Sequence, residues 1–103
     1  MRTVMVRYET EPGYADENAA MIHAVFDALR AGAPGGIRYT TYRAADGVSF
    51  VHVATIEGES PLPGLPAFQA FQERLRPNCV KAPVVVELTA VDSYASPGMG
   101  TPT

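Results

Sequence analysis

Residues 37–57, IRYTTYRAADGVSFVHVATIE, decide the fold class of this chain. The segment holds two extended runs that are rich in Tyr, Thr, Val and Ile, side chains that favour β-strands. Between the runs stands Asp46-Gly47, a strong signal for a two-residue type I′ turn. The segment therefore predicts a β-hairpin with strands at residues 37–44 and 48–57.

Outward from the hairpin, the sequence predicts a helix on each side and a strand beyond each helix. Residues 3–9 alternate in the period of two that a strand requires, and residues 14–31 repeat apolar side chains at helical spacing. A second helix begins at Pro66 and ends before Pro77, and residues 84–92 form the last strand. The order is β-α-β-β-α-β, an α+β, ferredoxin-like arrangement: a four-stranded antiparallel sheet with two helices on one face.

Composition favours one folded domain. The chain has 103 residues, of which 47% are hydrophobic and 18% charged. We expect a single domain at residues 1–94 and a flexible C-terminal tail, rich in Pro, Gly and Thr, at residues 95–103. The lone cysteine, Cys79, excludes an internal disulfide and a Cys-based zinc site.

Charge and hydropathy restrict the partners and the location. A net charge of -3 argues against nucleic acid or an anionic membrane surface as a partner. No apolar run approaches the roughly 18 residues of a membrane span. The first residues enter a strand pattern without a signal peptide, so we expect a cytoplasmic protein.

Both faces of the predicted sheet are apolar. The predicted turn pairs Thr41 with His52 and Tyr39 with Ala54. One hairpin face then carries Ile37, Tyr39, Thr41, Phe50, His52, Ala54 and Ile56, and the other carries Thr40, Tyr42, Val51, Val53 and Thr55. Two helices cover only one face of such a sheet, and an exposed apolar patch of this size is typical of an interface. We expect sheet-on-sheet homodimerisation; the alternative is a monomer with a partly apolar face.

The pattern over residues 1 to about 94 resembles the dimeric α/β-barrel superfamily, and within it the antibiotic-biosynthesis-monooxygenase-like group. Three segments carry the resemblance: VMVRYETEPG before the first helix, the hairpin GGIRYTTYRAADGVSFVHVATIE, and PAFQAFQ at the start of the second helix. The resemblance implies sheets that pair in a homodimeric α/β barrel. The superfamily includes cofactor-independent oxygenases of polycyclic aromatic substrates, haem-degrading enzymes, lactone isomerases and mutarotases, so the fold alone decides little about activity.

The haem-degrading relatives use an Asn on the first strand, a Trp at the end of the third and a His on the second helix. By motif position this chain has Val6, Ile56 and Gln72 there, and it contains no Trp. The resemblance therefore does not extend to haem degradation, and we expect no cofactor.

The resemblance also implies a cleft between the helices and the face with Val6 and Ile56. We expect His52 and Tyr39 to be catalytic there: His52 as acid or base because its intrinsic pKa lies near neutrality, and Tyr39 to polarise a substrate oxygen. Substrate-binding roles fall to three further residues: Tyr8, which orients an oxygen, Thr41, which fixes the tautomer of His52, and Gln72, which adds a hydrogen bond. Two histidines without matching carboxylates predict no metal site. In the alternative interpretation, His52 is a half-buried residue satisfied by a neighbour, and the tyrosines only pack across the sheet.

The sequence thus predicts a cofactor-independent monooxygenase-like enzyme, or an isomerase, acting on an aromatic or polyketide-like small molecule. One alternative is a non-catalytic dimeric small-molecule-binding or accessory protein. Another is a structural dimer without a closed cavity. The Pro-rich loop at residues 57–66 is expected to act as a lid on the cleft or as an arm over the dimer partner.

Overall fold

The computed structural model describes residues 1–100. Its regular elements are β1 (Arg2–Thr10), α1 (Ala15–Gly32), β2 (Ile37–Arg43), β3 (Ser49–Ile56), α2 (Pro66–Leu75) and β4 (Cys79–Leu88). Three short 3-10 turns connect them: η1 (Pro12–Tyr14), η2 (Leu62–Gly64) and η3 (Arg76–Asn78). This order confirms the predicted β-α-β-β-α-β fold class.

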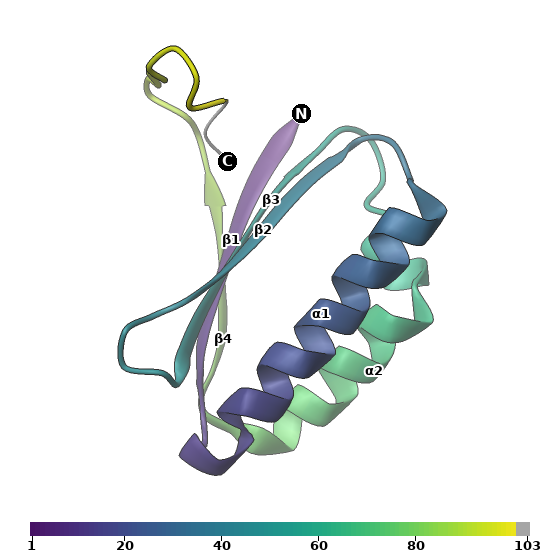
Figure 1. Cartoon of the computed structure of the whole chain (residues 1–103), viewed down its shortest axis with the longest axis vertical. Helices are drawn as coiled ribbons and strands as arrows, with labels where there is room; N and C mark the ends of the chain where they lie inside the picture. Colours follow the sequence, from purple (N-terminus) through teal and green to yellow (C-terminus); the bar gives the residue numbers. More distant parts are fainter. Residues whose placement is uncertain (101–103) are drawn as a thin grey trace.

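The four strands form one antiparallel sheet in the order β2-β3-β1-β4. Figure 1 shows α1 and α2 lying side by side on the same face of this sheet, with the other face uncovered. One face of the sheet is therefore buried against the helices, and the other is open. The predicted placement of both helices on one face is confirmed.

The core lies between the helices and the covered face of the sheet. Every second residue of β3, from Phe50 to Ile56, is buried, as expected for a strand with one covered face. From α1, Ile22 and Val25 pack against this face, and from α2, Phe71 and Leu75. Helical spacing of these apolar side chains is what directs both helices onto the sheet.

The hairpin has the predicted register but a different turn. Thr41 pairs with His52 and Tyr39 with Ala54, as expected. A type I′ turn needs positive φ at both central residues, whereas here only Gly47 has one (79°), and its N–H donates to the Ala44 carbonyl over 3.0 Å. The Asp46 carboxylate accepts hydrogen bonds from the backbone N–H groups of Val48 and Ser49 and from the Ser49 hydroxyl. This side chain stabilises a longer loop across the same strand register.

The predicted bounds of the last strand, residues 84–92, are wrong. β4 begins at Cys79 and ends at Leu88. It is an edge strand that pairs only with β1, and its register shifts between the partners of Arg7 and Glu9, where Pro83 lies. Proline lacks a backbone donor, but an edge strand with an irregularity tolerates it, so Pro83 does not delay the start of the strand.

Beyond Leu88 the described chain leaves the sheet without a further helix or strand, up to residue 100 (Figure 1). Val91, which we expected in the last strand, is 99% exposed. The expected tail at residues 95–103 falls only partly within the structure, since residues 101–103 lie outside the described residues.

Neither helix in the described part of the chain has the length and apolar character needed to cross a membrane.

Candidate functional site

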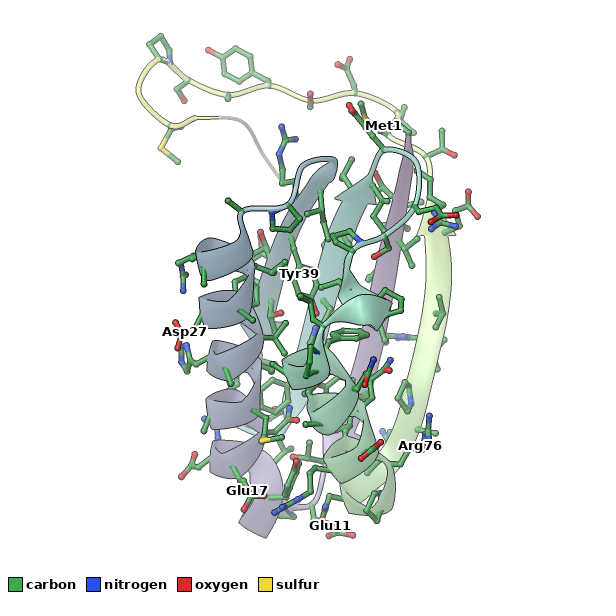
Figure 2. All side chains as sticks on the ribbon, turned by 90° about the vertical axis from the view of Figure 1, so that its right-hand side faces the viewer. Met1, Glu11, Glu17, Asp27, Tyr39 and Arg76 are labelled. Carbon is green, nitrogen blue, oxygen red and sulfur yellow. The ribbon has the colours of Figure 1, made fainter. Side chains whose placement is uncertain are left out.

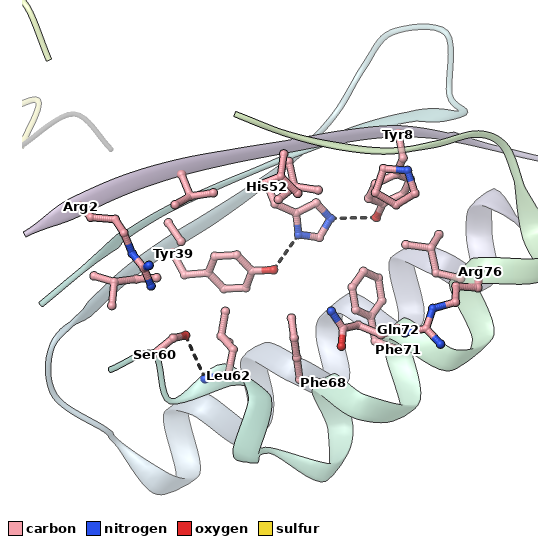
Figure 3. A pocket seen from close by; sticks show the side chains of 17 residues that line it. Arg2, Tyr8, Tyr39, His52, Ser60, Leu62, Phe68, Phe71, Gln72 and Arg76 are labelled. Carbon is pink, nitrogen blue, oxygen red and sulfur yellow. Dashed lines mark hydrogen bonds between the residues drawn. The ribbon is translucent and has the colours of Figure 1, made fainter. Parts of the chain in front are cut away.

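A cavity of about 450 Å³ opens between the sheet and α2 (Figure 3). Its floor comes from the covered face of β1, β2 and β3, and its opposite wall from α2 and the η2 turn. The apolar lining includes Val4, Val6, Ala54, Ile56, Leu62, Phe68, Phe71, Leu75 and Val85. Leu62 belongs to the Pro-rich loop, and its side chain is buried and lines the cavity wall.

His52 is the polar centre of this cavity. It stands on β3, at the middle of the sheet, and only 5% of its surface is exposed. Its Nε2 lies 2.8 Å from the Tyr8 hydroxyl and its Nδ1 lies 2.6 Å from the Tyr39 hydroxyl. The Thr41 hydroxyl is 3.2 Å from the same Nδ1. Both ring nitrogens are therefore hydrogen-bonded (Figure 3).

Register explains why these side chains meet. Thr41 is paired directly with His52 on the neighbouring strand, and Tyr39 lies two residues along, on the same face. On the other side of β3, Val6 pairs with His52 and Tyr8 with Phe50, which places Tyr8 diagonally beside the imidazole. Alternation in three adjacent strands thus brings the hydroxyls to one imidazole.

Asn18 extends the arrangement into α1. It is completely buried, and its Nδ2 donates to the Tyr8 hydroxyl over 2.9 Å. Ile22 and Val25 follow at helical spacing on the same buried side. Within residues 1–100, the Asn18 Oδ1 and the Tyr14 hydroxyl are buried without a hydrogen-bond partner.

Aromatic packing holds the site in place. The Tyr39 ring stacks on Phe26 of α1, with centroids 5.0 Å apart and an interplanar angle of 6°. Tyr8 stacks on Phe50 at 5.6 Å, and Phe71 of α2 lies 5.5 Å from the His52 ring. An aromatic neighbour thus packs against each of the three rings and restricts its position.

Burial keeps the three ring side chains uncharged. It lowers the pKa of His52 to about 4, because the imidazolium would lose its hydration. It raises the pKa of Tyr39 to about 12, although the Thr41 hydroxyl partly opposes this. The pKa of Tyr8 is also raised by burial, against the effect of the Asn18 hydrogen bond. At neutral pH the cavity therefore contains a chain of neutral donors and acceptors.

Positive and neutral polar groups stand nearer the ends of the cavity. Arg2 lines one end and Arg76 the other, with Ser60 and Gln72 also contributing (Figure 3). The cavity lining, as far as the structure describes it, contains no carboxylate.

A smaller hollow of about 230 Å³ lies beyond Tyr39. It is lined by Phe26, Leu29, Arg30, Pro34, Ile37 and Tyr39. Tyr39 is the residue common to both linings.

The structure brings together four of the five predicted site residues. His52, Tyr39, Tyr8 and Thr41 form one hydrogen-bonded group. Gln72 is exposed on α2 and lines the cavity, but no hydrogen bond joins it to this group in the described structure. Their catalytic and binding roles stay predictions.

Sequence reasoning missed Asn18, Arg2, Ser60 and Arg76. A signal for Asn18 existed: it falls four residues before Ile22 and seven before Val25, so it is a polar residue on a buried helical stripe. Figure 2, which looks onto the helices with the sheet behind them, shows Tyr39 in the gap between α1 and α2 and Arg76 near the end of α2. Arg2 and Arg76 lie far apart in the sequence, so no local motif joins them.

Within residues 1–100, no group of three or more His, Cys, Asp or Glu side chains is arranged to hold a metal ion.

Solved structures show how widely this fold is shared. Rv0793 from Mycobacterium tuberculosis superimposes with a TM-score of 0.71 at 21% identity, over 91% of this chain and 98% of that one. An antibiotic biosynthesis monooxygenase gives a TM-score of 0.73 at 14% identity, over 89% and 100% of the two chains. A mutant form of SnoaB, a cofactor-independent oxygenase from Streptomyces nogalater, gives 0.61 at 21% identity, over 92% and 97%.

The sequence matches no family model and no curated protein. The structural matches nevertheless run over nearly the whole of each chain. At such low identities the likeness concerns the backbone arrangement and not the chemistry. The chain therefore has the ferredoxin-like fold of the antibiotic-biosynthesis-monooxygenase-like proteins.

Proposed function

We propose that this chain is a cofactor-independent, monooxygenase-like enzyme that acts on an aromatic or polyketide-like small molecule in the cavity between sheet and α2. The observation that carries the proposal is a single imidazole held between two tyrosine hydroxyls inside an otherwise apolar space. Apolar walls with a few convergent polar groups suit a flat, weakly polar ligand. The cofactor-independent oxygenase among the structural neighbours supports the same class.

The proposed chemistry begins with proton removal from an acidic C–H that is conjugated with a carbonyl group. Tyr39 polarises the carbonyl oxygen, and His52 takes the proton when the substrate displaces one of its hydroxyl partners. The electron pair left on carbon reduces dioxygen, the co-substrate, and a C–O bond forms. Return of the proton from His52 gives a hydroperoxide, which loses water. One CH₂ group and O₂ thus become one C=O group and H₂O.

Anthrone provides a test, since its CH₂ group is flanked by two aromatic rings and converts to the ketone of anthraquinone. We expect the wild-type protein to accelerate oxygen uptake and anthraquinone formation above the buffer rate. His52→Ala should abolish the acceleration and leave the oligomeric state unchanged. His23→Ala is the matched control, because His23 is exposed on α1. An equal rate in His52→Ala and wild type would contradict a catalytic His52.

A non-catalytic small-molecule-binding or accessory role is the second candidate. It is favoured by the lowered pKa of His52, about 4, and by the occupation of both ring nitrogens, which make the free imidazole a weak base. In that case anthrone would bind saturably and be recovered at the buffer oxidation rate. His52→Ala would then cause only a modest loss of affinity.

We also propose that two copies of the chain pair through the uncovered sheet face. Tyr42 and Val84, both on this face, are 51% and 46% exposed. Met5, Val53 and Val86 continue the same apolar surface across β1, β3 and β4. Apolar side chains thus dominate this face, although exposed Arg7 lies between Val51 and Val84, and an exposed apolar surface of this kind supports association. The cytoplasmic location expected from the sequence stays a prediction.

A further inference from the structure

The hydrogen-bond chain of the site starts at a residue that does not line the cavity. Asn18 lies on α1, and its side-chain amide donates a hydrogen bond to the Tyr8 hydroxyl. It is completely buried and is not among the residues that line the cavity in the described part of the chain. Asn18 therefore acts on the cavity only through Tyr8.

This amide determines which way the hydrogens of the chain point. Within residues 1–100, the polar partners of the Tyr8 oxygen are Asn18 Nδ2 at 2.9 Å and His52 Nε2 at 2.8 Å. A phenol carries one hydrogen, and the Asn18 nitrogen cannot accept it. If His52 Nε2 also donated, the hydroxyl hydrogen of Tyr8 would be buried without an acceptor, which costs free energy. Tyr8 therefore donates to Nε2.

The hydrogen bond between Tyr8 and His52 also determines which atom donates between His52 and Tyr39. A neutral imidazole carries one N–H, so an accepting Nε2 places the hydrogen on Nδ1. Nδ1 then donates to the Tyr39 oxygen, 2.6 Å away, and Thr41 Oγ1 at 3.2 Å is a weaker second acceptor. Because Tyr39 accepts from His52, its own hydroxyl hydrogen can be donated elsewhere, with the Thr41 hydroxyl as the acceptor that a ligand oxygen would have to replace.

The Tyr39 hydroxyl that carries this hydrogen belongs to a residue of the cavity lining. Figure 3 shows the Tyr39 ring lying along the cavity, with its hydroxyl between His52 and the side of α2 that carries Phe68. Arg2 and Arg76 also present only donors to the cavity, and no carboxylate is present among the described lining residues, whereas Ser60 and Gln72 can both donate and accept.

We propose that Asn18 is a positioning residue that sets the direction of the chain Asn18–Tyr8–His52–Tyr39, so that Tyr39 meets a ligand as a donor and the cavity selects an acceptor oxygen. The inference rests on the proposed function for the presence of a small aromatic ligand. The direction of the hydrogen bonds does not depend on that ligand.

The direction is tested directly by the tautomer of His52 in the ligand-free protein. In long-range ¹H–¹⁵N spectra of histidine-labelled protein near neutral pH, His52 should show a protonated Nδ1 and an unprotonated Nε2. Exposed His23 serves as the internal reference. A wild-type His52 with its hydrogen on Nε2 would reverse the chain and overturn the proposal.

Asn18→Asp tests the role of the amide at nearly constant side-chain volume. The introduced carboxylate accepts the Tyr8 hydrogen in place of Nε2, so the Nε2–H form of His52 should be populated. Asn78→Asp is the matched control, because it removes an amide hydrogen bond to the Arg74 carbonyl that is separate from the chain. Should Asn18→Asp fail to fold, Asn18→Ala leaves room for a water that can accept the Tyr8 hydrogen, and both tautomers of His52 should then be populated. A purely Nδ1-protonated His52 in whichever variant folds would contradict the proposal.

A pair of probes tests the donor role of Tyr39. Fluorenone and fluorene have the same ring system, but only fluorenone has a carbonyl oxygen. Tyr39→Phe should weaken fluorenone binding about five-fold, equivalent to about 1 kcal/mol for one hydrogen bond, and leave fluorene binding unchanged. Equal losses, or none, would overturn the donor role. If neither probe binds the wild type, the proposed aromatic ligand fails, whereas the tautomer still decides the direction.

Discussion

His52 is a base that folding keeps unprotonated, and its burial links stability to pH. Its pKa in the folded protein is about 4, below the ordinary value of about 6.5 for an unfolded chain. Between these two values the unfolded state binds the additional proton. The contribution of His52 to stability is therefore complete above about pH 6.5 and is lost as the pH falls towards 4. The loss amounts to about 3 kcal/mol.

Urea unfolding between about pH 7.5 and about pH 4.5 measures this effect. We expect the free energy of unfolding of the wild type to decrease more steeply on acidification than that of His52→Gln, which cannot be protonated. His23→Gln should follow the wild type. Parallel curves for wild type and His52→Gln would show that His52 is not held neutral by burial.

Two glycines with similar backbone angles should respond differently to alanine. Gly36 has φ of 76° and Gly47 has φ of 79°, so both disfavour a side chain. A Cβ at Gly36 would lie 2.9 Å from the backbone oxygen of Glu57, whereas a Cβ at Gly47 would meet nothing within 4 Å. We expect Gly36→Ala to destabilise the protein by about 2–3 kcal/mol and Gly47→Ala by about 1 kcal/mol. Equal thermal midpoints would contradict the close contact.

Residue patterns predicted part of the candidate site. Alternation along the strands was sufficient to place Tyr39, Thr41 and His52 on one face, because a period of two leaves no other choice once the register is set. Asn18 was missed because the helical stripe was drawn through apolar residues alone. Its burial depends on a hydrogen bond to Tyr8, a tertiary contact that helix periodicity does not contain.

At the level of elements, α2 depends on a few buried side chains of one helical turn. Leu75 is 5% exposed and packs into the core, whereas Glu73 on the same helix is exposed. We expect Leu75→Ala to lower the free energy of unfolding by about 3 kcal/mol and Glu73→Ala by less than about 0.5 kcal/mol, measured by urea unfolding. A similar small loss for both would mean that α2 is not anchored by Leu75.

Element types were predictable and element ends were not. The helices and the hairpin register follow from periodicity, which many residues report together. The turn conformation instead depends on the bonds of the Asp46 carboxylate, and the start of β4 depends on how an edge strand accommodates Pro83. Each of these local arrangements depends on one or two contacts, so the periodicity of the sequence does not predict them.

On the scale of the whole molecule, the uncovered sheet face is the surface through which we propose that two copies pair. Val53 lies in β3 on this face, opposite Met5 of β1. We expect wild-type protein to give a dimer mass in native mass spectrometry and Val53→Glu to give a monomer mass, because a buried carboxylate at the interface would be unpaired. Val91→Glu, at the exposed position beyond β4, is the control and should stay dimeric. A monomeric wild type would contradict the proposed pairing.

The position of Tyr39 between the two hollows couples two properties that a protein engineer would wish to tune separately. A shorter side chain there would be expected to join spaces of about 450 Å³ and about 230 Å³. Such a change would admit longer molecules and remove the hydroxyl in the same step. Phenylalanine keeps the partition and changes only the polarity. Selectivity for ligand length and selectivity for ligand polarity therefore depend on the same ring.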